Sequence, residues 1–77
     1  MSNDDDKIQL NLDSGMSSSA MSQARALFDE IININTKITI MKETYGAENC
    51  AEELSEIRRI RKYMKDRMRF YENGGNV

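Results

Sequence analysis

The chain has 77 residues, one cysteine, no histidine and a formal net charge of −2. A chain this short forms at most one small domain and buries little apolar surface by itself, so we expect it to be stabilised by association with another chain. One cysteine excludes an intramolecular disulfide, and the missing histidine excludes Cys/His zinc sites and histidine-based catalysis. These features favour a reducing compartment, and we expect a cytoplasmic protein.

The charges are distributed unevenly along the chain. Residues 1–13 carry four aspartates against one lysine, whereas residues 58–69 carry seven basic residues against one acidic residue. Such asymmetry indicates that the basic end contacts nucleic acid, an acidic protein surface or the acidic end of the chain itself; a solvated helix face is the simpler alternative. No run of residues is apolar enough for a membrane span, so we expect no membrane contact.

Residues 1–19 are rich in aspartate and serine and predict a flexible arm, because such a composition does not compensate the entropy lost on ordering. Within this arm Ile8, Leu10 and Leu12 alternate with polar residues. The alternation predicts a short strand at residues 7–12 that binds the edge of a partner's sheet. The alternative is a disordered arm in which the three aliphatic residues have no role.

The same segment resembles a known peptide motif. The run from Gln9 to Leu12, with the sequence QLNL, is similar to the short glutamine–leucine peptides that bind bacterial sliding clamps. Asp13 follows where those peptides usually have an aromatic or aliphatic residue. The resemblance covers four residues and implies a clamp as one partner, but it defines no family for the chain.

Between residues 20 and 45, apolar residues recur at alternating intervals of four and three, which predicts a helix with a heptad seam. One serine of the run 17–19 is the expected N-cap, and Gly46 is expected to end the helix. Residues 32–40 also alternate between apolar and polar side chains, many of them β-branched, which favours a strand. We prefer the helix because it explains more of the segment. The seam comprises Ala20, Ala24, Leu27, Ile31, Ile34, Ile38, Met41 and Tyr45.

A second helix is predicted over residues 49–72, with residues 74–77 as a frayed end. Asn49 is the expected N-cap, and Glu52 would complete a capping box with it. Its seam contains one charged residue, Arg61, and one cysteine that we interpret as a core residue. The seam comprises Cys50, Leu54, Ile57, Arg61, Met64, Met68 and Tyr71.

The predicted fold is therefore all-α, an antiparallel two-helix hairpin over residues 20–73 that is completed by oligomerisation or by a partner. Two helices cannot cover each other's apolar faces, and we expect a trough that a second copy or a partner's helix fills. The predicted partner-binding residues are those of the trough together with the aliphatic residues of the arm: Ile8, Leu10, Leu12, Phe28, Ile32, Ile60 and Met64.

No residue pattern indicates catalysis, a cofactor, a metal site or a small-molecule substrate, so the sequence predicts a non-enzymatic protein. We expect a protein–protein interaction module, such as an adaptor, an assembly chaperone or an inhibitor that occupies a partner's surface. A phage or bacterial accessory protein is one setting for such a module. The partner would be a second copy of the chain or a larger protein.

A basic stripe on the second helix supports a different hypothesis. Its members recur at helical spacing and are interleaved with Tyr63, Phe70 and Tyr71, so they could follow phosphates while the aromatic rings stack on bases. This hypothesis predicts an oligomer of hairpins that binds RNA or DNA; a second alternative is a component of a larger structural assembly. The basic stripe comprises Arg58, Arg61, Lys62, Lys65 and Arg69.

Overall fold

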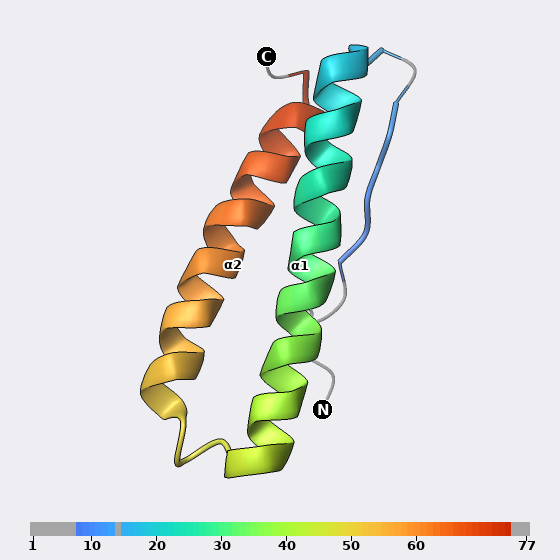
Figure 1. Cartoon of the computed structure of the whole chain (residues 1–77). Coiled ribbons are helices and arrows are strands. Elements are labelled where there is room, and N and C mark those ends of the chain that lie inside the picture. Colours follow the sequence, from blue (N-terminus) through green and yellow to red (C-terminus); the bar gives the residue numbers. More distant parts are fainter. Residues whose placement is uncertain (1–7, 14, 75–77) are drawn as a thin grey trace.

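The structure is a computed structural model that describes residues 8–13 and 15–74. Its two helices are α1 (Ser18–Tyr45) and α2 (Ala51–Glu72), which pack side by side in opposite directions (Figure 1). The predicted all-α helical hairpin is confirmed. Neither helix is long and apolar enough, within the described part of the chain, to cross a membrane.

Ser17 caps the start of α1. Its backbone is extended, and its side-chain hydroxyl oxygen accepts a hydrogen bond from the backbone N–H of Ala20 at 3.1 Å. A helix begins directly after the residue whose side chain satisfies one of its free N–H groups. Because the first serine of the run is the one that caps, α1 begins at Ser18 rather than at residue 20.

Residues 32–40 are helical throughout, so the strand alternative is wrong. The hydroxyls of Thr36 and Thr39 each donate to the backbone carbonyl four residues earlier, at 3.2 Å. Both hydroxyls of these β-branched residues thus have a hydrogen-bond partner within the helix. Ile31 and Ile38 are both buried. Residues seven apart share one face of a helix but point to opposite faces of a strand, so the shared burial against α2 requires the helix.

The turn differs from the prediction in how its polar groups are used. Gly46 ends α1 with a positive φ of 84°, but Asn49 does not cap α2. Its side-chain amide instead donates to the carbonyl of Tyr45 at 2.7 Å, which is one of the carbonyls that the end of α1 leaves free. Cys50 therefore precedes α2 without a side-chain cap, and α2 begins at Ala51 rather than at residue 49. Two glutamates in its first turn complement the helix dipole.

The buried residues follow the predicted seams and divide into two clusters. The open-end cluster lies where the start of α1 meets the end of α2, and the turn-end cluster lies near the connection. The open-end cluster comprises Met16, Ala20, Ala24, Ile31, Met68 and Tyr71. The turn-end cluster comprises Ile38, Cys50 and Leu54.

Arg61 separates the two clusters. Only 3% of this residue is exposed, and its guanidinium donates to the side-chain oxygen of Asn35 on α1 at 2.6 Å. A charged group is costly to bury unless it is hydrogen-bonded, so this bond makes Arg61 tolerable within the helix contact. The amide nitrogen of Asn35 is buried without a hydrogen-bond partner among the described residues.

The Arg61 bond can be tested with Asn35→Ala, using Asn33→Ala as a matched control. Asn33 is exposed on the same helix, so the control reports the effect of alanine on helix propensity alone. We expect Asn35→Ala to lower the free energy of unfolding by about 1–3 kcal/mol relative to the control, because one acceptor of a buried guanidinium is lost. Urea unfolding followed by circular dichroism measures the difference, and equal stabilities of the two variants would contradict this account.

Candidate functional site

The hairpin presents two sides, which we name by the residues next to the helix contact. In an antiparallel helix pair, residues that directly follow the contact positions of both helices lie on one side, and residues that directly precede them lie on the other. Ile31 and Arg61 are buried contact positions. Ile32 and Lys62 therefore lie on one side, the basic side, and Ile60 lies on the opposite side, the apolar side.

The apolar side carries a row of half-buried residues from both helices. All of them pack against the two core clusters while remaining partly exposed, and residues of one helix lie one heptad apart. Ile60 borders this row and is 47% exposed. The apolar row comprises Leu27, Ile34, Met41, Ile57 and Met64.

The structure divides the predicted trough between the two sides. Met64 belongs to the apolar row and Ile60 borders it, whereas Phe28 and Ile32 follow contact positions and lie on the basic side. Phe28 packs against the open-end cluster, and Ile32 is 41% exposed. The spacing of these residues in the sequence does not show on which side of the hairpin each one lies.

Residues 8–13 run alongside α1 toward the middle of the hairpin (Figure 1). Ile8 and Leu10 pack against the open-end cluster, whereas Leu12 is exposed. Two of the three alternating aliphatic residues thus pack against the hairpin of their own chain. Residues 8–13 form no strand, and Lys7, the first residue of the predicted strand, lies outside the described residues.

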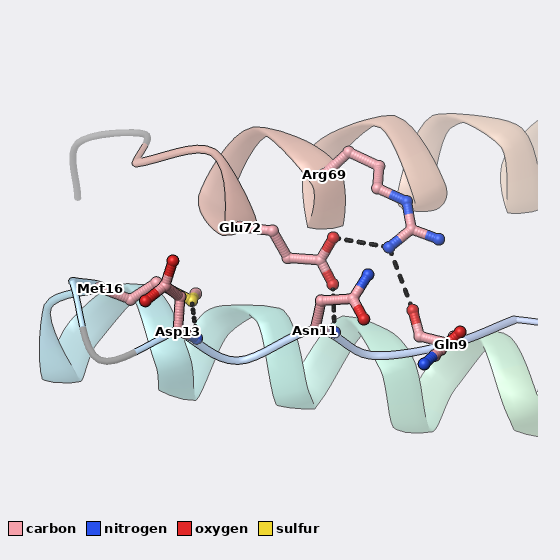
Figure 2. A network of polar contacts seen from close by, with 6 residues as sticks. All are labelled: Gln9, Asn11, Asp13, Met16, Arg69 and Glu72. Carbon is pink, nitrogen blue, oxygen red and sulfur yellow. Dashed lines mark hydrogen bonds and ion pairs between the residues drawn. The ribbon is translucent and has the colours of Figure 1, made fainter.

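Two side chains of α2 bind the backbone of this segment. The carboxylate of Glu72 accepts a hydrogen bond from the Asn11 N–H at 2.8 Å, and the guanidinium of Arg69 donates to the Gln9 carbonyl at 3.0 Å (Figure 2). Arg69 and Glu72 are themselves paired at 2.6 Å. Side chains of α2 therefore satisfy two of the backbone groups that the edge of a sheet could otherwise bind.

The basic side contains a cleft of about 440 Å³ on α2. Four residues of the predicted basic stripe line it, and the fifth, Arg69, binds the N-terminal segment instead. Lys62 and Asp66 form an exposed ion pair at 3.5 Å, a kind of contact that contributes little to stability. The cleft is lined by Ser55, Arg58, Arg59, Arg61, Lys62, Lys65 and Asp66.

The aromatic residues of α2 lie outside this cleft. The guanidinium carbon of Arg67 lies 5.1 Å from the ring centroid of Phe70 and 5.2 Å from that of Tyr71, and the two rings pack edge to face. Arg67 also donates to the Tyr71 hydroxyl at 2.8 Å. Tyr63 is 66% exposed and does not line the cleft either. The rings predicted beside the basic stripe thus lie outside the cleft, and Phe70 and Tyr71 pack against Arg67, which is not a member of the stripe.

Cys50 is buried in the turn-end cluster, where its thiol donates to the Gly46 carbonyl at 3.2 Å. This confirms the interpretation of Cys50 as a core residue. Across residues 8–13 and 15–74, no three side chains of histidine, cysteine, aspartate or glutamate gather where they could hold a metal ion.

Comparisons of the chain with models of protein families, with curated proteins and with solved structures gave no match. The functional argument therefore depends on the geometry of the two sides. The apolar side offers half-buried surface from both helices, and the basic side combines a cationic cleft with the bound N-terminal segment.

The contact between the N-terminal segment and α2 can be tested with Glu72→Ala, using Asp66→Ala as the control. The side chain of Glu72 is 6% exposed and accepts from the Asn11 amide, whereas Asp66 is an exposed carboxylate on the same helix. We expect hydrogen exchange at the Asn11 amide to accelerate about tenfold in Glu72→Ala, because a charge-assisted hydrogen bond is lost. Exchange measured by NMR that is equally fast in the wild type would show that this bond does not protect the amide.

Proposed function

We propose that the chain is a non-enzymatic interaction module whose apolar side binds an apolar helical surface of another protein chain. A second copy of the hairpin is the simplest complement, and a larger protein with an exposed helix is the other. The module would act as an adaptor, an assembly chaperone or an inhibitor by occupying that surface. The observation that carries this proposal is the apolar row, whose residues stay partly exposed in the hairpin.

The spacing of the row supports a helical partner. Leu27, Ile34 and Met41 lie one heptad apart on α1, and Ile57 and Met64 lie one heptad apart on α2. Two such lines of apolar residues match the spacing that the seam of another helix needs to pack against them at coiled-coil geometry. Two hairpins joined through these sides would form a four-helix bundle, an architecture that completes the core of each.

The proposal also places the module in the cytoplasm. Its support is the cysteine usage: the chain has a single cysteine, buried as a free thiol, and so derives no disulfide from an oxidising compartment. Detection of the tagged chain in fractionated cells checks this placement.

The proposed contact can be tested with Ile60→Gln and the matched control Ile40→Gln. Ile60 borders the apolar row, whereas Ile40, 55% exposed, lies two residues beyond the buried Ile38 and so faces away from α2. We expect the wild type to form a dimer or a larger oligomer in sedimentation equilibrium. Ile60→Gln should raise its dissociation constant at least about tenfold, since fully burying an isoleucine contributes about 1.5–3 kcal/mol. Ile40→Gln should leave it unchanged.

A monomeric wild type would show that the apolar side does not bind a second copy, which leaves a larger protein as the partner. If the monomer binds a fluorescent apolar dye and loses this binding in Ile60→Gln but not in Ile40→Gln, the apolar side is available to a different protein and the module remains supported. A monomer that binds no dye and unfolds with the same stability in both variants would overturn the proposal.

A further inference from the structure

The basic cleft lies on the side of the hairpin that the proposed function does not use. Five cations line it against one carboxylate, that of Asp66. Arg58, Lys62 and Lys65 follow one another at about one helical turn, or roughly 5.4 Å. Like charges gathered this closely favour an anionic ligand. Alternate residues of an extended peptide are about 6.6 Å apart, so the cations are spaced to meet the carboxylates of an extended acidic segment.

The N-terminal segment of the chain runs toward this cleft. Traced from Asn11 back to Gln9, it passes first the carboxylate of Glu72 and then the guanidinium of Arg69 (Figure 2). Traced in this direction, it lies alongside α1 on the basic side and passes from the open end of the hairpin toward its middle (Figure 1). The next cation on that side is Lys65, about one turn beyond Arg69, and Lys65 lines the cleft.

The remaining chain is long enough to reach from Arg69 along the cleft. Residues 1–7 lie outside the described part of the chain and contain Asp4, Asp5 and Asp6. From Gln9 to Asp4 an extended chain spans about 16 Å, and from Arg69 to Arg58 a helix also spans about 16 Å. A fully extended segment thus brings Asp4 as far along the hairpin as Arg58, and Asp6, about 10 Å from Gln9, as far as Lys62.

We propose that the cleft is a binding site for an extended acidic peptide and that its resident occupant is the segment Asp4–Asp6 of the same chain. Three observations combine here: the excess of cations, the direction of the bound segment, and the reach of its acidic end. This occupant competes with any other polyanion for the cleft. The inference concerns the basic side and stands independently of the proposed role of the apolar side.

Carbodiimide crosslinking of the full-length chain tests the contact directly, because this reagent joins only carboxylates and amines that touch. We expect links from Asp4, Asp5 or Asp6 to Lys62 and Lys65, with their yield falling several-fold in 1 M salt as the charges are screened. Lys37, exposed on α1 just before the contact position Ile38 and hence on the apolar side, serves as the internal control. Links to Lys62 and Lys65 no more abundant than links to Lys37 would overturn the proposal.

A mixture of chains with natural and heavy nitrogen isotopes shows whether the occupant comes from the same molecule. A link within one chain joins two peptides that carry the same isotope, and links of this kind alone support the proposal. Links that form mainly between chains would overturn it, because the segment would then occupy the cleft of a second copy.

A competition experiment tests the consequence for other anions, with a fluorescent 15-nucleotide oligothymidylate as the probe. We expect the triple variant Asp4→Asn, Asp5→Asn, Asp6→Asn to bind the probe at least about fivefold more tightly than a charge-matched control. The control is Asp29→Asn, Glu30→Gln, Glu56→Gln, which removes the same number of charges from exposed positions that do not line the cleft.

Equal affinities in the two triple variants would overturn the proposal, because the segment would then not compete for the cleft. Tight binding of the oligothymidylate by the wild type, unchanged when the three aspartates are replaced, would also overturn it and would identify nucleic acid as the occupant.

Discussion

The hydrogen bond between Arg61 and Asn35 is the constraint on which the rest of the hairpin depends. A guanidinium within the contact between α1 and α2 requires an acceptor, and Asn35 supplies one at 2.6 Å. Sliding α2 by one heptad along α1 would move Arg61 away from this acceptor and against an apolar part of the seam. Such polar contacts specify helix register at some cost in stability. Here the contact also separates the apolar interior into two clusters.

Once the register is set, each flanking residue belongs to one side of the hairpin. Lys62 follows Arg61 and lies beside the cationic cleft, whereas Ile60 precedes it and borders the apolar row. The N-terminal segment is bound on the basic side through Arg69 and Glu72. A single short chain can therefore present two chemically different surfaces that do not overlap, one suited to an apolar helix and one to an anion.

Several features of the fold could be predicted from the sequence because they depend on neighbours within a few residues. The serine cap, the end of α1 at Tyr45 and the burial of one line of seam residues on each helix follow from local spacing, although Tyr45, also a seam residue, is 62% exposed. Four of the five stripe residues line one cleft, since residues three and four apart share a helix face. Asn49 was misassigned because α2 begins only at Ala51, and the Asn49 amide donates to the carbonyl at the end of α1 instead. The role of Asn35 gave no local signal, because its partner is 26 residues away.

By itself the sequence determined that this chain is a helical hairpin with one acidic and one basic end. Heptad spacing and helix-end residues are properties of short segments, and they act in the same way wherever the segment lies. The tertiary structure alone decided which residues share a surface. It placed Ile32 and Ile60 on opposite sides, separated the aromatic rings from the cleft and directed Arg69 to the Gln9 carbonyl. These outcomes depend on the rotation and register of one helix against the other, and those are set by contacts between residues far apart in the chain.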